Sequence, residues 1–282
     1  MNYQEGTFDL AVGIPTLKNQ LTSIERQRRL KALKFWGLVV CTFVALAMIS
    51  SHSMDLSESL TNSISYLTST PLRQKRFVFV GSYTKEVDSI VVDCAMDGRG
   101  ITVFELDPTT GNLQFTGNTV ESGENPSILT VGREKSLLFA ANELGSQDKG
   151  KLFSFLIDSD SGGLVALDDI ELPGYNPSSI NISPDEKYLA TSYFLGDGGF
   201  SIHSVQPDGS FGALTAHATW EAGSRCHTAA FTPGGAAFVL ALDWALDLVL
   251  SFALDPATGA ATEVDRAALA AGAGPRSLAW GA

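Results

Sequence analysis

A pattern of short strands and tight turns returns about every 50 residues between residue 77 and the C-terminus. Four segments carry an apolar run, then an Asp or Gln, and then a turn of Pro, Ser, Asp, Thr or Gly. They read ITVFELDPTTGNL from Ile101, LFSFLIDSDSGGL from Leu152, FSIHSVQPDGSFG from Phe200 and VLSFALDPATGAA from Val249. Because Pro fixes φ and Gly tolerates positive φ, these turns predict hairpin corners.

A second phrase recurs with the same spacing. It reads NPSILTV, NPSSINI, RCHTAAF and GPRSLAW, and the first three copies lead through a turn into LLFAANE, YLATSYF and AFVLALD. Each period therefore holds about four strands, and no stretch after residue 77 has the 3.6-residue period of an amphipathic helix. Four strands in a repeat of this length are typical of a β-propeller blade.

We therefore expect an all-β fold, a β-propeller of four-stranded blades, over residues 77–282. The strands are apolar on both faces because neighbouring blades would cover both. Just over four periods fit, so about four to four and a half blades are predicted. The closing GPRSLAWGA is predicted to be only the opening strand of a further period.

The N-terminal segment has a different composition. Residues 1–34 end in a cluster of Arg and Lys and are predicted to be a basic cytosolic tail, because such charge resists translocation. Residues 35–51 are uncharged and apolar and are predicted to be a transmembrane signal anchor, with 52–76 as a linker. The propeller is then expected on the lumenal or extracellular side. A cleaved signal or an organelle-targeting segment is the alternative.

Net charge and cysteine content limit the kinds of ligand and cross-link that the chain is expected to have. A net charge of −12 disfavours binding to nucleic acid, whose phosphates would be repelled. The three cysteines, Cys41, Cys94 and Cys226, match no zinc motif or disulfide framework, so buried free thiols are expected. We predict neither a metal nor a cofactor.

Several phrases together resemble the seven-bladed β-propeller lactonase family, which includes a bacterial type of 6-phosphogluconolactonase and fungal carboxymuconate cycloisomerases. They are FVGSYT, GITVFELDPTTGNL, NPSILTV with AANE, LPGYNPSSINISPDEKYLATSYF and GPRSLA, within residues 77–282. The resemblance implies a seven-bladed propeller, of which this sequence would hold only part. It also implies that one end of the central channel binds a lactone, with or without a phosphate.

The sequence departs from the family pattern at three places. Arg225 stands where the family has the first His of GPHAHS, while His227 matches the second. Arg276 matches the Arg of GPRH, but Ser277 replaces its His. Tyr193 matches the Tyr of NYGGGS, and Ser192 replaces the Asn. These changes bear on catalysis more than on the fold.

Equivalent positions in successive blades should point to equivalent places around the channel. Ser127, Ser178, His227 and Arg276 share one position in the repeat. His227 is predicted to be a base or proton shuttle, and Arg276 a clamp for an anion or oxyanion. The alternative is that His227 only caps a strand through a hydrogen bond.

Other polar and aromatic residues of the repeat are further candidates for the site. Glu143 is predicted to orient water or His227, although a solvated strand-end acid is an alternative. Arg225, Asn142 and Tyr193 are predicted to contact substrate. His203 is expected to be a packing residue, because the same place in the other copies holds Phe104, Phe155 and Phe252.

The sequence is compatible with three functions. The first is hydrolysis of a sugar lactone without a metal, as the resemblance to 6-phosphogluconolactonase implies. The second is a cycloisomerase that forms or opens a lactone by proton transfer at carbon. The third is a non-catalytic propeller that displays a binding face from a membrane anchor. The predicted location outside the cytosol favours the third, and His227 with Arg276 favours the first two.

Overall fold

The computed structural model describes residues 75–87, 96–132, 134, 136–146, 148–235 and 237–281. All of them belong to one compact unit, Gln74–Ala282. The predicted basic tail, anchor and nearly all of the linker lie outside the described residues, as does Cys94. Within the described residues, no helix is both long and apolar enough to cross a membrane. The predicted anchor therefore stays a prediction.

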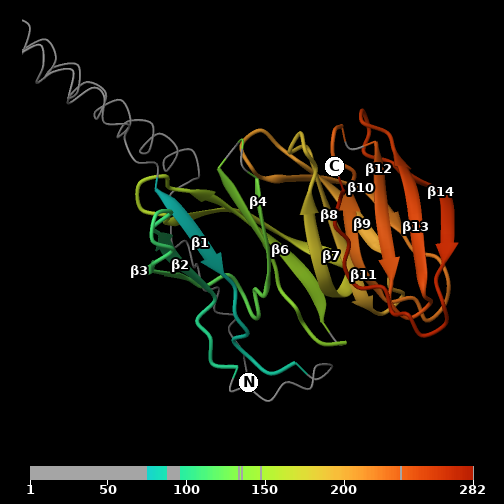
Figure 1. Ribbon diagram of the computed structural model, residues 1–282, viewed down its shortest axis with the longest axis horizontal. Coiled ribbons are helices and arrows are strands. Elements are labelled where there is room, and N and C mark those ends of the chain that lie inside the picture. The colour runs from blue at the N-terminus through green and yellow to red at the C-terminus, as the bar shows by residue number, and fades with distance from the viewer. Residues whose placement is uncertain are drawn as a thin grey trace, which may run out of the picture. The chain divides into compact units, whose positions relative to one another are not determined.

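The described part of the chain consists of strands joined by turns, which confirms the predicted all-β class. Three sheets have the orders β1-β2-β3, β10-β9-β8-β7-β6-β5-β4 and β11-β12-β13-β14, and Figure 1 shows them following one another along the chain. The strands are β1 (Arg76–Val80), β2 (Ile101–Leu106), β3 (Leu113–Val120), β4 (Ile128–Gly132), β5 (Leu137–Ala141), β6 (Lys149–Ile157), β7 (Leu164–Ile182), β8 (Tyr188–Leu195), β9 (Phe200–Val205), β10 (Phe211–Ala218), β11 (Cys226–Phe231), β12 (Phe238–Asp243), β13 (Leu248–Leu254) and β14 (Ala261–Ala268).

The seven-stranded sheet is two blades that share one long strand. The first part of β7 pairs with β6 from Leu164 to Tyr175, and the second part pairs with β8 from Tyr175 to Ile182. Divided there, the described residues form three four-stranded blades, preceded by the three-stranded blade β1–β3. All neighbouring strands within the blades are antiparallel.

Two details of the predicted blade pattern need correction. The first blade has three strands among the described residues rather than four. Residues 275–281 were expected to open a further blade as a strand, but they form no strand in the structure. A strand needs a hydrogen-bonded neighbour, and no strand of the described chain pairs with this segment.

The repeated corners have one hydrogen-bond pattern. The Asp107 carboxylate accepts hydrogen bonds from the backbone amides of Thr109 and Thr110, while Gly111 donates to the Asp107 carbonyl. Asp158 and Asp255 open the corresponding turns in the same way. The closing glycines have positive φ, 76° for Gly111 and 69° for Gly162, where a side chain would be strained. The Asp-to-Gly spacing therefore specifies each corner.

The core lies between successive blades. One apolar cluster joins residues of β8 and β9 to residues of β11, β12 and β13, and includes Phe200, Val239, Leu250 and Phe252. The rings of Phe200 and Phe252 meet edge to face with centroids 4.9 Å apart, the geometry that aromatic pairs favour. A second cluster joins β2 to β5 and β6 through Ile101, Leu138, Ala140 and Phe155. Each blade is thus stabilised by its neighbours.

His203 packs inside its blade, as its place in the repeat predicts. It is 4% exposed, and its Nδ1 has no hydrogen-bond partner among the described residues. Burial, followed by the nearby charge of His217, lowers the pKa of His203 to about 4. The folded state therefore holds a neutral imidazole where other blades hold Phe.

We predict that His203 makes the fold sensitive to acid. Because its folded pKa lies below the ordinary value of 6.5, stability is fully present above pH 6.5 and is lost as the pH falls toward 4. At pH 5 this single group should cost on the order of 2 kcal/mol of unfolding free energy. Urea unfolding of the wild type and of His203→Phe at pH 7 and pH 5 measures the difference. An equal acid loss in both proteins would contradict the prediction.

Candidate functional site

The opening strands of successive blades lie side by side. The Ser178 hydroxyl donates to the Cys226 carbonyl at 2.8 Å, and the Ser192 hydroxyl donates to the His227 carbonyl at 3.1 Å. The segment that carries Arg276 lies beside β11 in the same way, because the Thr228 hydroxyl of β11 donates to the Arg276 carbonyl at 2.6 Å. Residues 275–281 therefore run beside β11 although they form no strand. The shared repeat position brings His227 and Arg276 close together.

His227 is half-buried at this point. Its ring meets the ring of Phe194 edge to face, with centroids 5.8 Å apart. Burial and then the positive charge of Arg276 lower the pKa of His227 from its ordinary 6.5, while the backbone groups of both residues oppose the shift in part. At neutral pH the imidazole is therefore uncharged and can accept a proton.

Cationic and aromatic side chains surround His227. The Arg225 guanidinium lies 5.3 Å from the centroid of the Phe194 ring, within the range of a cation–π interaction. Phe194 also contacts Trp244, with ring centroids 5.6 Å apart. Arg225 and Trp244 border a cavity of about 660 Å³ whose other lining residues are Ala245, Asp247, Gly272, Ala273 and Gly274.

A buried carboxylate fixes the ends of the strands that carry these residues. Asp243, at the end of β12, has no exposed surface. Its Oδ2 accepts hydrogen bonds from Trp220 Nε1 and Ser224 Oγ, both at 2.6 Å. Its Oδ1 accepts from the amides of Arg225, Ala245 and Leu246. One side chain thus joins the segment before β11 to the loop after β12.

A second carboxylate holds the loop that leads to Arg276. Asp247 accepts hydrogen bonds from the amides of Gly272 and Gly274, both at 2.7 Å, and these bonds lower the pKa of Asp247. Gly274 has a φ of 54°, and a Cβ at this position would lie 2.9 Å from Trp244 Nε1. The loop therefore packs closely against the Trp244 indole, and a side chain at Gly274 would be strained.

Glu143 belongs to a separate cluster at the junction of the first two blades. Its Oε2 accepts hydrogen bonds from the Tyr83 hydroxyl at 2.6 Å and from the Ser127 hydroxyl at 2.9 Å. Asn125 bridges the same junction, because its Oδ1 accepts from the amides of Thr84 and Lys85. No described hydrogen bond joins Glu143 to His227. The two predicted catalytic groups lie in clusters on different blades.

Asn142 and Tyr193, the other predicted substrate contacts, are buried. The Asn142 side-chain oxygen accepts from the Lys151 amide. Tyr193 has no exposed surface, and its hydroxyl is hydrogen-bonded to Ser201. Burial raises the pKa of Tyr193, and its ring lies against Gly174, where a Cβ would come within 2.4 Å. Both side chains stabilise their blades, and their predicted contact with substrate stays a prediction.

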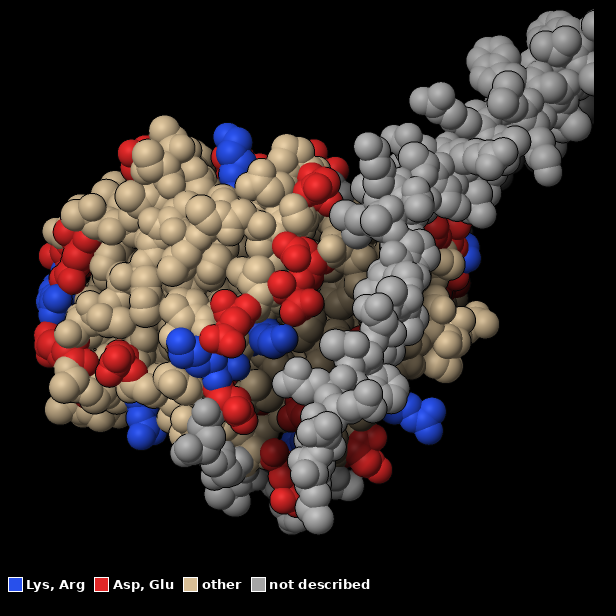
Figure 2. Space-filling view, turned by 180° about the vertical axis from the view of Figure 1, so that it is seen from behind, with Lys and Arg blue, Asp and Glu red and all other residues tan. Residues whose placement is uncertain are grey.

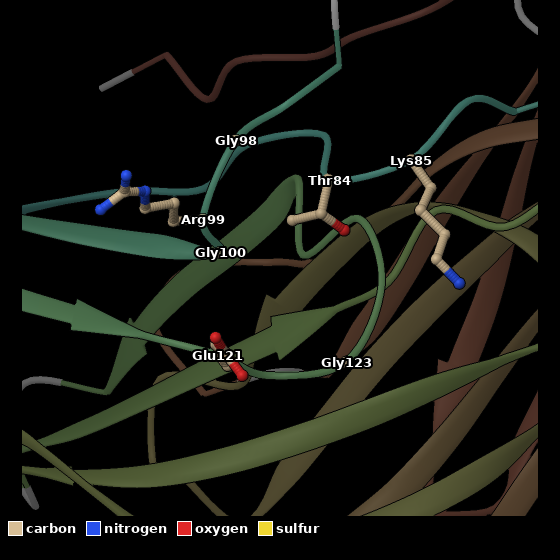
Figure 3. Close-up of a pocket in the computed structure, with 7 residues that line it drawn as sticks. All are labelled: Thr84, Lys85, Gly98, Arg99, Gly100, Glu121 and Gly123. Carbon is tan, nitrogen blue, oxygen red and sulfur yellow. The ribbon is translucent and has the colours of Figure 1, made fainter.

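A smaller cavity of about 370 Å³ lies beside the first blade. It is lined by Thr84, Lys85, Gly98, Arg99, Gly100, Glu121 and Gly123. Figure 3 shows the side chains of Lys85 and Arg99 extending in opposite directions rather than toward a shared point. Lys85 is also paired with Glu124. The cationic groups of this cavity therefore do not converge on one point.

Charge and metal-binding groups are dispersed over the described part of the chain. It holds no cluster of three or more His, Cys, Asp or Glu side chains placed to bind a metal. Figure 2 shows acidic and basic side chains interspersed on the face it presents. Cys226 is a buried free thiol, as expected, and burial raises its pKa.

Four residues of the His227 site were not predicted from the sequence: Phe194, Asp243, Trp244 and Asp247. One signal was available, since Phe194 and Trp244 occupy the place that Glu143 occupies in its own copy. This place ends the second strand of each blade, next to the opening strand.

We predict that Asp243→Asn destabilises the protein, because an amide nitrogen cannot accept the hydrogen bonds of Trp220 and Ser224. The buried donors left unpaired should cost about 2 kcal/mol of unfolding free energy. Urea unfolding followed by circular dichroism measures this, and Trp220 fluorescence reports the local change. Asp208→Asn is the matched control, because Asp208 lies in an exposed turn and accepts only from Ser210. Equal stability of the two variants would be the contrary result.

Two curated relatives are similar to this chain in sequence. The chain is 27% identical over 210 residues to a 6-phosphogluconolactonase of Bacillus subtilis. The aligned region covers 72% of this chain and 55% of that protein. It is 31% identical over 132 residues to a 6-phosphogluconolactonase of Formosa agariphila. This aligned region covers 47% of this chain and 34% of that protein. The chain therefore spans about half or less of the length of these relatives.

Solved structures share the fold. A putative 6-phosphogluconolactonase from Bacteroides uniformis superposes with a TM-score of 0.62 at 20% identity, over 72% of this chain and 57% of that one. The periplasmic gluconolactonase of Pseudomonas aeruginosa superposes with a TM-score of 0.61 at 21% identity, over the same shares of the two chains. Residues 77–282 match the family described as lactonase, 7-bladed β-propeller. The chain therefore belongs to the seven-bladed β-propeller lactonase family.

Proposed function

We propose that the protein hydrolyses a sugar lactone at the site formed by His227, Arg276 and Arg225. The observation that carries the proposal is that the half-buried His227 lies beside the segment that carries Arg276, which the Thr228 hydroxyl holds through the Arg276 carbonyl. The neighbouring Arg225 lines a cavity. The two named relatives are 6-phosphogluconolactonases, which supports a lactone as the substrate class.

In the proposed mechanism, His227 removes a proton from a water molecule as the water oxygen attacks the lactone carbonyl carbon. The carbonyl oxygen becomes negative, and the Arg276 guanidinium stabilises it. The bond between the acyl carbon and the ring oxygen then breaks. The ring oxygen takes the proton back from the His227 imidazolium, which leaves an open-chain hydroxy acid. No step of this mechanism needs a metal or a cofactor.

Arg225 extends the site toward substrates that carry a second anionic group. Its guanidinium is exposed and is held over Phe194. Arg225 lines the cavity, and Arg276 follows two residues after Gly274, which also lines it. Two arginines in this region suit a phosphorylated lactone, because a guanidinium group can bind two phosphate oxygens at once. A carboxylate would be bound in the same way, so a cycloisomerase substrate fits the same cations.

A non-catalytic binding module is the second candidate function. The observation that favours it is the placement of Glu143, whose carboxylate is bonded to Tyr83 and Ser127 and not to His227. His227 then lacks a described carboxylate to orient it. In this alternative, the two arginines and the aromatic pair Phe194 and Trp244 would bind an anionic ligand without turnover.

We predict that His227→Gln lowers kcat for lactone opening by about 100-fold, because it removes the base. The assay follows acid release from glucono-δ-lactone and from its 6-phosphate, after subtraction of the spontaneous rate. The wild-type rate should fall as the pH drops through the lowered pKa of His227, below 6.5, because the imidazole then becomes charged. Arg266→Gln, which removes a surface ion pair with Glu221 and Glu263, is the control. Saturable ligand binding by a folded wild type without turnover would favour the binding module.

We also predict that Arg276→Gln lowers kcat/KM by about 30-fold, because the oxyanion loses its charged partner. Removal of Arg225 should instead raise KM for the 6-phosphate more than for the unphosphorylated lactone, since only the former carries the second anion. Steady-state kinetics with both substrates separates these effects. Equal changes of KM for the two lactones in Arg225→Gln would remove Arg225 from the phosphate site.

A further inference from the structure

His227 is the extra residue of a β-bulge in β11. Cys226 pairs with Asp243 of β12. Thr228 pairs with Leu242, the residue just before Asp243, so two steps along β11 match one step along β12. A bulge leaves its extra residue out of the ladder and redirects its side chain. The pairing with β12 therefore does not by itself fix the position of His227.

The preceding blade has the same bulge at the equivalent place. Two steps along β7, from Pro177 to Ser179, match one step along β8, which makes Ser178 the extra residue. Ser178 and His227 share one position in the repeat. The bulge is therefore a repeated feature of these opening strands, and in the last blade it carries an imidazole. Bulges are frequent beside active sites, where they redirect a side chain.

Serine hydroxyls of the preceding blade hold the backbone on both sides of the bulge in β11. The Ser178 hydroxyl donates to the Cys226 carbonyl. The Ser192 hydroxyl donates to the carbonyl of His227 itself. Two residues farther along β11, a backbone amide donates to Ser179 Oγ at 3.2 Å. Among the described residues β11 is an edge strand, so its outward backbone groups need partners from outside the sheet, and these hydroxyls supply them.

The three hydroxyls form one connected network with Ser192 at its centre. Ser192 Oγ lies 3.0 Å from Ser178 Oγ and 2.7 Å from Ser179 Oγ. Each hydroxyl has a single proton to donate. Because Ser192 gives its proton to the His227 carbonyl, the hydrogen bond with Ser179 runs from Ser179 to Ser192. Ser192 has no exposed surface, so solvent does not replace a hydroxyl that is lost at this position.

The same strand also holds the imidazole ring. Ser192 and Phe194 are two residues apart on β8, so their side chains share the face that meets β11. The Phe194 ring packs edge to face on the His227 ring. His227 Nδ1 is buried and has no hydrogen-bond partner among the described residues. The direction of the ring therefore depends on the bulge and on its contact with Phe194.

We propose that Ser192 is a positioning residue for His227. Its hydroxyl, together with those of Ser178 and Ser179, fixes the bulge in β11 and thereby holds the imidazole against Phe194. Without this hydroxyl the bulge relaxes, and the imidazole moves among several positions. A misplacement of about 1 Å can lower the rate of a catalysed reaction on the order of 100-fold. The consequence for turnover rests on the lactone hydrolysis proposed above, whereas the position of His227 does not.

NMR titration of His227 in the full 282-residue chain tests the proposal, with the imidazole signal assigned through His227→Gln. Ser192→Ala should raise the pKa of His227 by about 0.5 unit toward 6.5, because a mobile ring is less buried and lies farther on average from Arg276. The signal should also broaden, since the ring exchanges among positions. Ser192→Cys keeps a side chain of similar size with only a weak donor, so it should behave as Ser192→Ala does.

Two other buried serines provide matched controls. Ser201→Ala removes the hydroxyl that is bonded to Tyr193 on the opposite face of the same blade, so it lowers stability without reaching β11. Ser154→Ala removes a buried hydroxyl that has no hydrogen-bond partner among the described residues. Neither substitution should shift the pKa of His227.

Steady-state kinetics with glucono-δ-lactone and its 6-phosphate gives the second measurement. In Ser192→Ala, kcat should fall about 10-fold while KM stays within about twofold, because the base is displaced and the groups that bind substrate are kept. Ser154→Ala should keep the wild-type values. A wild type without turnover would contradict the proposed function, and the NMR comparison would still decide whether Ser192 positions His227.

Ser178→Ala is the second variant and decides the matter if Ser192→Ala does not fold. Ser178 is partly exposed, and its removal frees the Cys226 carbonyl but leaves the Ser192 hydroxyl in place. A smaller rise of the pKa of His227 in the same direction is therefore expected. An unchanged pKa in the folded variants of Ser192 and Ser178 would overturn the proposal. An equal rise in Ser201→Ala would overturn it as well, because the shift would then reflect lost stability and not the hydroxyl network.

Discussion

Packing of one β-blade on the next is the interaction on which the rest of this structure depends. Each sheet is apolar on both faces and cannot cover both by itself, so the core forms between blades. Phe200 of one blade meets Phe252 of the next, and Ile101 packs with Leu138 across another junction. This stacking sets the opening strands beside one another. The contact between His227 and Arg276 is therefore a consequence of the core.

Much of the fold could be predicted because the signals are local and repeated. The corners at Asp107, Asp158 and Asp255 depend on hydrogen bonds within a few residues, which the sequence shows directly. The union of two blades through β7 could not be predicted in this way. The LPGYNPSS segment contains Gly174 and Pro177, which usually end a strand, yet β7 continues through both as the pairing passes from β6 to β8.

The site was predicted only in part. A shared repeat position indicated that His227 and Arg276 would meet, because equivalent residues of stacked blades lie together. The partners of Glu143 could not be found in this way, since Tyr83 lies 60 residues earlier, outside the repeated phrases that suggested the site. The role of Asp243 was equally hidden. Its five hydrogen bonds form only after the chain before β11 and the loop after β12 have come together.

The pKa of His227 tests the central claim most directly, because it depends on how closely two neighbouring blades bring their side chains together. NMR titration of the imidazole in the wild type should give a pKa below 6.5. In Arg276→Gln the pKa should rise, since the adjacent positive charge is gone, while burial still keeps it below the ordinary value. A wild-type pKa at 6.5 or above, or the same value in both proteins, would show that the two residues do not meet and would contradict this arrangement of blades.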